Sequence, residues 1–329
     1  MLDIPANLHK TELEVLAWTD HFFGPDFLKP FVVPNRRGGD IRMSFTTDRD
    51  RLPDVDAVWF HGPSIQEMPN RSEKTQPWVL MSMESDVNYP YLKNPLVRAY
   101  FDVLMTYRLY SDVPCIYPNW NQYGDFLEQP PSRSGASEGA LAAYIASNPV
   151  AYRDQYIAEL MHHIAVDSLG SCLNNRRIDT FVEGGWSEGA WSSILDVMKQ
   201  YKFYLAFENS QTIDYVTERV FHALNSGTVP VYLGASNIRE FMPDPAAVII
   251  ASEFDSPALL ARYLRQLDTD NDAYQQHLAW KNSGYSAQFK QLLNLGSTPP
   301  QQRLAVKLAH GCDRSCTCGG RLREAVNRN

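Results

Sequence analysis

The chain has 329 residues, of which 44% are hydrophobic and 21% charged, and these values are those of an ordinary globular protein. This length favours two domains over one. The net charge is −8 and no long run of Lys and Arg occurs, so we expect no nucleic-acid partner. No apolar stretch approaches the roughly 18 to 20 residues of a membrane-spanning helix. The first residues lack a signal-peptide pattern, so either the protein is soluble as written or an anchor lies outside this sequence.

Apolar segments of strand length recur along the chain, with patterned helices between them. The expected strands are Val55–Phe60, Trp78–Met83, Phe101–Tyr107, Ala142–Ala146, Thr180–Val182, Phe203–Phe207, Val229–Leu233 and Val248–Ala251. Such alternation is typical of an α/β architecture with parallel sheets. The segment Glu128–Gly139 is rich in Pro, Ser and Gly, and we expect it to be a linker that divides the chain into domains 1–130 and 131–329.

Several expected helices follow residues that cap helices well, because their side chains accept hydrogen bonds from the first backbone amides. The caps and their helices are Asn148 before a helix that begins at Pro149, Asp214 before Tyr215–Asn225, and Ser256-Pro257 before Leu259–Leu267. After about Tyr274, further helices are expected to pack back on the body of the protein.

Familiar nucleotide and metal motifs are missing from the sequence. Gly184 and Gly189 have the separation of a P-loop, but Ala190 stands where the lysine must be, and no GxGxxG follows a strand. His162 and His163 are adjacent, so they point to different faces of a helix and make poor joint ligands. We therefore expect no catalytic metal, and expect any nucleotide to be held by helix N-termini and single basic side chains.

The cysteines give no clear framework. Cys115 and Cys172 are isolated and are expected to be buried thiols. Three more follow His310 near the C-terminus, namely Cys312, Cys316 and Cys318. A local disulfide, free thiols or a zinc site of unusual spacing all remain open for this group.

The most informative run is Tyr201–Gly234. An expected strand ends there in Glu208-Asn209-Ser210, where a parallel sheet presents its carboxyl edge to ligands. The following helix carries Thr217-Glu218-Arg219 in its first turns. An arginine near the positive end of a helix dipole is unfavourable unless an anion is present, and a guanidinium binds diphosphate as a planar fork. A surface pair between Glu218 and Arg219 is the alternative interpretation.

This run closely resembles the donor-binding signature of the α-1,3/1,4-fucosyltransferase family, glycosyltransferase family 10. In that family a YKFxLxFENS strand is followed by a YxTEK helix and a PVxxG strand. This sequence has Arg219 where the family usually has Lys, which keeps the charge but changes its geometry. The resemblance covers roughly Phe60 to Asp270.

The resemblance implies a set of donor-binding residues. Ser147-Asn148-Pro149 with Arg153 is similar to the family's strand–helix element, whose arginine contacts the nucleotide phosphates. Asn209 and Glu218 would orient hydroxyls of the fucose or ribose, and Tyr201 or Tyr215 would lie near the guanine or ribose. The complete set is Ser147, Asn148, Arg153, Tyr201, Asn209, Tyr215, Thr217, Glu218 and Arg219.

The resemblance also implies a catalytic base in the first half. Met83-Glu84-Ser85 is similar to the family's Glu-Ser-Pro element, in which the glutamate is the general base, although Asp86 stands where many members have Pro. Met105–Arg108 and Ser111-Asp112 are similar to the family's second fingerprint, so Arg108 and Asp112 are expected on the acceptor side.

The family membership so indicated implies a GT-B type fold, with two Rossmann-like α/β domains facing across a cleft. Residues 1–130 would carry acceptor recognition and the base, and residues 131–329 would bind the donor and end in a helical tail. The implied reaction is inverting transfer of L-fucose from GDP-fucose to a GlcNAc- or Glc-type hydroxyl of a glycan, with an α-1,3 linkage favoured. No cofactor would be required, and a divalent metal would at most stimulate.

Other readings of the sequence remain open. The enzyme could use another GDP-sugar such as GDP-mannose, or the chain could be a catalytically silent glycan-binding relative, against which the presence of Glu84, Arg153 and Glu218 together argues. Membrane-associated glycosylation of proteins fits the family. The compartment stays open between the cytoplasm or membrane surface and, with an anchor, the Golgi lumen, and the oligomeric state is not indicated.

Overall fold

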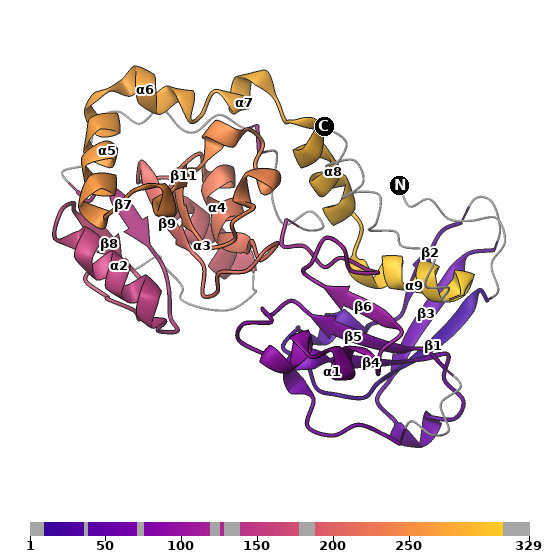
Figure 1. Cartoon of the computed structure of the whole chain (residues 1–329). Coiled ribbons are helices and arrows are strands. Elements are labelled where there is room, and N and C mark those ends of the chain that lie inside the picture. The colour runs from indigo at the N-terminus through magenta and orange to yellow at the C-terminus, as the bar shows by residue number, and fades with distance from the viewer. Residues whose placement is uncertain are drawn as a thin grey trace. The chain divides into compact units, whose positions relative to one another are not determined.

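The structure, a computed structural model, describes residues 10–35, 39–70, 76–118, 126–127, 139–177 and 188–311. The chain divides into two compact units. The first is formed by residues 1–120 together with 295–329, and the second by residues 121–294. Each unit is built around its own mainly parallel sheet (Figure 1).

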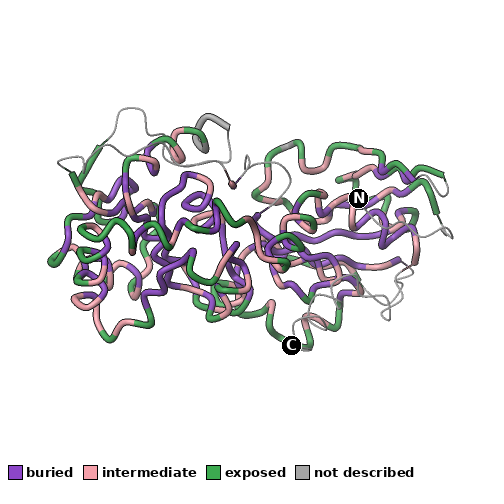
Figure 2. Tube along the Cα trace, turned by 90° about the horizontal axis from the view of Figure 1, so that it is seen from above, coloured by how far each residue is buried: buried purple, intermediate pink, exposed green. Residues whose placement is uncertain are grey.

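In the described part of the first unit, the strands are β1 (Glu12–Ala17), β2 (Phe31–Val33), β3 (Ile41–Thr46), β4 (Ala57–His61), β5 (Trp78–Ser82) and β6 (Val103–Thr106). They form one sheet in the order β2-β3-β1-β4-β5-β6. All neighbours are parallel except β2, which runs antiparallel to β3 at the edge. The strands β4 and β5 are buried along their whole length (Figure 2). This burial on both faces explains why their sequences are continuous apolar runs.

Two segments from distant parts of the sequence pack on the first sheet. Around the short helix α1 (Pro95–Arg98), Phe101 meets Phe60 with ring centroids 5.4 Å apart, and both contact the core beside Trp78. Near the other end of the chain, α9 (Pro300–His310) packs against β1, β2 and β3 (Figure 1).

The placement of α9 differs from the expected division into 1–130 and 131–329, because residues from 295 onward belong to the first unit. The buried Lys307 of α9 forms an ion pair with Asp112, with 3.2 Å between Nζ and Oδ1. Leu304 and Ala305 of the same helix are fully buried. The sequence shows that α9 has an apolar face, but not which of the two sheets covers it.

In the described part of the second unit, the strands are β7 (Ala142–Tyr144), β8 (Val166–Ser168), β9 (Phe203–Phe207), β10 (Val229–Leu233) and β11 (Ile249–Ile250). They form a fully parallel sheet in the order β11-β10-β9-β7-β8. The helices α2 (Ala151–Met161) and α5 (Pro257–Thr269) cover one face, and α3 (Glu188–Met198) and α4 (Glu218–Ser226) cover the other (Figure 1). The chain then continues through α6 (Asn271–Gln276), α7 (Trp280–Ser283) and α8 (Ala287–Gly296).

Most of the expected strands are present. Phe203–Phe207 and Val229–Leu233 are confirmed residue for residue as β9 and β10. The others in the described ranges occur as β4, β5, β6, β7 and β11 with shifted or shorter bounds, whereas Thr180–Val182 lies outside the described residues. The sequence pattern does not reveal β1, β2, β3 and β8, because charged residues or short length interrupt their apolar runs.

The capping predictions have mixed outcomes. Ser256 is confirmed, since its side chain accepts from the amide of Leu259. The prediction for Asn148 is wrong, because α2 begins at Ala151 and its cap is Val150, whose amide is held by the carboxylate of Asp154. The prediction for Asp214 is also wrong. Asp214 has a φ of 65°, in the left-handed region, and Thr217 instead occupies the N-cap position of α4, without a capping hydrogen bond from its side chain.

The expectations about the cysteines and the linker are only partly covered by the described residues. Cys115 and Cys172 are free and buried, as expected. The proposed linker, apart from its last residue, and the cysteines at 312, 316 and 318 lie outside the described residues. None of the helices in the described ranges combines the length and apolar character needed to cross a membrane.

The ion pair of α9 gives a test of its assignment to the first unit. Lys307→Met keeps most of the side-chain volume but removes the cation from Asp112, so we expect the free energy of unfolding to fall by about 2 kcal/mol. Chemical denaturation of the purified protein measures this loss. Lys290→Met, at an exposed position of α8, is the matched control and is expected to change stability by less than about 0.5 kcal/mol. Equal stability of the two variants would contradict the assignment.

Candidate functional site

In the second sheet, the order in which successive strands are added reverses between β7 and β9. From β7 the chain moves to β8 on one side, while β9, β10 and β11 extend the sheet on the other. At such a switch point, the loops that follow two neighbouring strands run in opposite directions. A crevice therefore forms between them at the carboxyl edge of the sheet. The residues that follow β7 lead to Arg153 in α2, and the residue that follows β9 is Glu208. The topology therefore brings Arg153 and Glu208 to the same crevice.

A buried network joins the end of β9 to the start of α4. The carboxylate of Glu208 accepts hydrogen bonds from the backbone amide and the hydroxyl of Thr217, both at 2.7 Å. The Nη1 atom of Arg219 donates to the Thr217 hydroxyl at 2.7 Å and lies 3.3 Å from the Glu208 carboxylate. Thr217 thus links the two charged groups, and Arg219 is held in one orientation at the first turn of α4.

In this network, burial and the neighbouring charges have opposite effects on the pKa of each charged group. Burial raises the pKa of Glu208 to about 7, although Arg219 and the hydrogen bonds from Thr217 lower it. Burial alone lowers the pKa of Arg219, but the nearby carboxylates of Glu218 and Glu208 outweigh it and raise that pKa above its ordinary value. The guanidinium therefore keeps its charge, whereas Glu208 exchanges a proton near neutral pH.

Gly234, directly after β10, leaves room for this network. A Cβ atom at this position would lie 2.4 Å from the hydroxyl of Tyr232 and 2.6 Å from Cγ of Glu208. Neither atom has space to withdraw, because both residues are buried and hydrogen-bonded. The glycine is required here by close packing against the Glu208 side chain.

Arg153 is the second cation of the crevice, and its side chain is only 1% exposed. Its Nη2 atom donates to the backbone carbonyl of Asn148 at 2.5 Å, and its guanidinium lies 5.8 Å from the ring centre of Tyr144. Its Nε atom is 3.5 Å from Asp154 but makes no hydrogen bond within the described residues. A buried guanidinium with an unsatisfied donor is costly, and an anion in the crevice would satisfy it.

Tyr152 joins the two segments that carry the arginines. Its hydroxyl donates to the backbone carbonyl of Glu208 at 2.6 Å, so the start of α2 is tied to the end of β9. Burial raises the pKa of this hydroxyl to about 12, while the positive charges of both Arg153 and Arg219 act to lower it. Both guanidinium groups therefore lie within electrostatic reach of one hydroxyl. Together they can neutralise a group that carries more than one negative charge.

The other expected donor residues divide into two groups. Asn209 follows Glu208, Glu218 lies 3.3 Å from Arg219, and the exposed Ser147 and Asn148 lie between β7 and α2. Tyr215 is buried on the same side, and its carbonyl accepts from the Tyr232 hydroxyl at 3.2 Å. All of these positions lie at the carboxyl edge.

Tyr201 is not brought to this edge. It precedes β9 rather than following it, and its hydroxyl donates to the carboxylate of Asp167 at 2.8 Å. A strand rises roughly 3.3 Å per residue, so the backbones of Tyr201 and Glu208 are separated by roughly 20 Å. The structure gives Tyr201 a structural role at the amino edge of the sheet.

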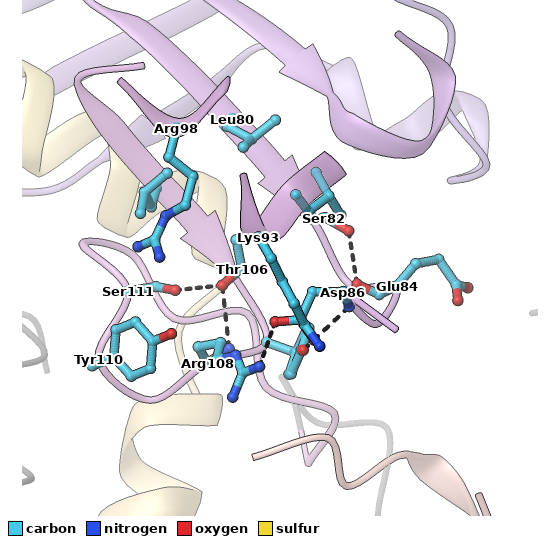
Figure 3. Close-up of a pocket in the computed structure, with 13 residues that line it drawn as sticks. Leu80, Ser82, Glu84, Asp86, Lys93, Arg98, Thr106, Arg108, Tyr110 and Ser111 are labelled. Atoms are coloured by element: carbon cyan, nitrogen blue, oxygen red, sulfur yellow. Dashed lines mark hydrogen bonds and ion pairs between the residues drawn. The ribbon is translucent and has the colours of Figure 1, made fainter. Parts of the chain in front are cut away.

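In the first unit, a pocket of about 270 Å³ lies at the carboxyl ends of β5 and β6. Glu84, which follows β5, and Arg108, which follows β6, both line it. The half-buried Glu84 is held through its backbone, because its carbonyl accepts from the hydroxyl of Ser82 at 2.9 Å. Its side chain extends away from Arg108 and Asp86 (Figure 3). Burial and the negative charge of Glu84 raise the pKa of Tyr89, so these two residues are close.

Asp86 is the carboxylate that holds the cations of this pocket. It forms a direct hydrogen-bonded ion pair with Arg108, and its other oxygen lies 3.4 Å from the Nζ atom of Lys93 (Figure 3). Burial acts to raise the pKa of Asp86, but Arg108 outweighs burial and keeps that pKa below its usual value. Asp86 therefore remains charged, and it fixes Arg108 at the pocket wall.

Asp112 is not among the residues that line this pocket. Its carboxylate accepts from the amide of Leu104 at 2.8 Å and pairs with Lys307 of α9. The structure therefore brings Arg108 and Glu84 together at one pocket, but uses Asp112 to tie the loop after β6 to its own strand and to α9.

Sequence reasoning missed several residues of both sites. Glu208 and Tyr152 each adjoin an expected donor residue, and the position of Glu208 at the end of a buried strand was the available signal. Lys93 and Arg98 of the Glu84 pocket gave no local signal, because they reach it from a short turn and helix. Among the residues that the structure describes, no group of three or more His, Cys, Asp and Glu is placed to hold a metal ion.

The first sheet has its own switch point, between β1 and β4. Aromatic side chains fill it. His61 is buried, stacks near Trp59 and bonds the Ser64 hydroxyl through Nδ1 at 2.8 Å, with Phe22 and Phe23 packed edge-on against its ring. Burial lowers the pKa of His61 to about 4, so the ring is neutral at physiological pH.

Two sequence profiles match this chain. The profile of glycosyltransferase family 10 (fucosyltransferase), C-terminal part, matches residues 137–308, and that of the fucosyltransferase N-terminal domain matches residues 10–118. A GDP-fucose protein O-fucosyltransferase 3 from Danio rerio is 31% identical over 298 residues, which cover 85% of this chain and 63% of that protein. The protein of the same name from Xenopus tropicalis is 34% identical over 257 residues, covering 73% and 53%. The chain thus spans about half to two thirds of these relatives.

Solved structures show the same fold. The crystal structure of an α1,3-fucosyltransferase with GDP superposes with a TM-score of 0.59 at 16% identity, covering 94% of both chains. An α1,3-fucosyltransferase with GDP-fucose gives a TM-score of 0.50 at 17% identity, covering 92% of this chain and 90% of that one. The fold is therefore of the GT-B type, with Rossmann-like parallel sheets, as the sequence indicated.

The raised pKa of Glu208 predicts how stability depends on pH. Between about pH 4.5 and pH 7 the folded protein keeps a proton on Glu208 that the unfolded chain has released, so this group makes unfolding easier as pH rises through that window. Glu208→Gln cannot lose this proton. The stability of the variant relative to the wild type should therefore increase from pH 4.5 to pH 7, as measured by denaturation at a series of pH values. A difference that does not change with pH would contradict the burial of a titrating carboxyl group.

Proposed function

The chain belongs to glycosyltransferase family 10, the fucosyltransferases, and on that premise we propose that it transfers L-fucose from GDP-fucose to a hydroxyl group of an acceptor. The observation that carries the proposal is the pair of guanidinium groups, Arg153 and Arg219, at the switch point of the second sheet. The partly unsatisfied, buried guanidinium of Arg153 favours a diphosphate as the group that completes this crevice.

In the proposed donor complex, Arg153 and Arg219 bind the diphosphate of GDP-fucose, together with backbone amides at the start of α4. Glu218 and Asn209 orient hydroxyl groups of the fucose or ribose. The charge on the departing GDP is balanced by the guanidinium groups, so the scheme needs no metal ion for this task. Thr217 and Glu208 hold Arg219 in place before the donor arrives.

Glu84 is the proposed general base. As the acceptor oxygen attacks C1 of fucose, its proton passes to the Glu84 carboxylate, while the bond from C1 to the diphosphate oxygen breaks and GDP leaves. Attack on the face opposite GDP inverts the configuration. The division of carboxylates in the pocket supports this role, since Asp86 holds Arg108 and Lys93 and the Glu84 side chain extends away from them (Figure 3).

The acceptor we favour is a serine or threonine hydroxyl of a protein. The relatives at 31% and 34% identity are named as protein O-fucosyltransferases. A GlcNAc- or Glc-type hydroxyl, fucosylated in α-1,3 linkage, is the second candidate, because the solved structures of the same fold are α1,3-fucosyltransferases. Incubation with GDP-fucose and either secreted proteins or a glycan array, followed by mass spectrometry of the products, separates them. Transfer from GDP-mannose but not GDP-fucose would overturn the donor.

The base is tested by Glu84→Gln, which keeps the shape of the side chain but removes its basicity. We expect kcat to fall by about 10²- to 10⁴-fold while the Kd for GDP-fucose changes by less than about twofold. Radiolabelled transfer and calorimetry measure the two quantities. Glu12→Gln, an exposed glutamate of the same unit, is the control. Near-normal turnover by Glu84→Gln would remove Glu84 from the mechanism.

The donor site is tested by Arg153→Ala and Arg219→Ala. Each removes charge-assisted hydrogen bonds worth about 1.5–3 kcal/mol, so we expect the Kd for GDP to rise by about 10- to 100-fold. Arg219→Lys should recover part of this loss, because it restores the charge without the fork. Arg176→Ala, which removes the partner of Asp167 near Tyr201, should leave the Kd unchanged. Equal effects of Arg219→Ala and Arg176→Ala would refute the site.

A further inference from the structure

The pocket beside Glu84 combines an apolar floor with a charged rim. Leu80, Leu92 and Leu104 supply the apolar part. The hydroxyls of Thr106 and Ser111 are hydrogen-bonded to each other on the wall. The charged residues on the lining are Lys93, Arg98 and Arg108 against Glu84 and Asp86. The lining therefore has more cations than anions.

Arg98 is the cation of this lining that has no carboxylate paired with it in the described ranges. Asp86 already binds both Arg108 and Lys93. Arg98, the last residue of α1, is half-buried, and its guanidinium makes no hydrogen bond or ion pair with any residue in the described ranges. Figure 3 shows this guanidinium on the same side of the pocket as Ser111 and Tyr110, away from the Glu84 carboxylate. A half-buried cation without a counter-charge attracts an anion from solution.

We propose that this pocket binds an acidic side chain of the protein acceptor, with Arg98 as the group that pairs with its carboxylate; this rests on the function proposed above. A carboxylate matches the planar fork of a guanidinium, and the leucine floor accommodates the methylene stem of a glutamate or aspartate. The volume of about 270 Å³ suits a short side chain. The Glu84 pocket then selects serine or threonine hydroxyls that lie near an acidic residue.

The test uses two small probes, the α-amides of N-acetylglutamate and N-acetylglutamine, which differ only in the charged group. Saturation-transfer NMR with the full chain measures their Kd values. We expect the acid to bind at least tenfold more tightly than the amide to the wild type, and Arg98→Gln to abolish this preference. Arg42→Gln removes an exposed arginine of the same unit, outside the pocket, and should keep the preference.

The outcomes separate this inference from the proposed function. A preference that survives in Arg98→Gln, or is absent from the wild type, overturns the carboxylate subsite. N-Acetylneuraminate, a sugar that carries a carboxylate, is a third probe. If it binds more tightly than the glutamate probe, the carboxylate comes from a sialylated glycan and not from an acidic side chain of a protein, which would overturn the proposal. Binding of GDP-fucose to Arg98→Gln should equal that of the wild type. Failure of the wild type to bind or turn over GDP-fucose would instead refute the proposed function.

Discussion

Arg153 is buried and Arg219 is partly buried at the switch point of the second sheet, and the removal of these two cations from water has an energetic cost that neighbouring groups must offset. Arg219 meets the cost through Thr217, Glu208 and Glu218. Arg153 meets only part of it, through one backbone carbonyl and a nearby carboxylate. The crevice is therefore incomplete as a set of protein contacts, and a bound diphosphate supplies the missing negative charge in the function that we propose.

The parallel topology makes this arrangement possible. Strands that run the same way deliver the residues after them to one edge, so Tyr152, Glu208 and Gly234 meet although they are distant in sequence. The same rule brings Glu84 and Arg108 together after β5 and β6. Both candidate sites thus lie at carboxyl edges, whereas the contact between Tyr201 and Asp167 lies outside them.

The two carboxylates of the first pocket have different surroundings. Asp86 is engaged by cations and keeps a low pKa, which suits a positioning role for Arg108. The side chain of Glu84 extends away from those cations (Figure 3). This division leaves Arg98 as the cation available to an acceptor. In the function that we propose, one pocket combines proton transfer with selection of the acceptor.

The sequence by itself determined the features that depend on neighbouring residues: the strands β9 and β10, the Ser256 cap, the polar ends of the strands and the resemblance that they carry. Only the tertiary structure decided which sheet α9 covers, that Asp112 pairs with Lys307, that Tyr201 lies at the far edge, and that Glu208 and Arg98 belong to the sites. Burial and ion pairing depend on segments distant in the chain, and a local pattern of side chains does not specify those contacts.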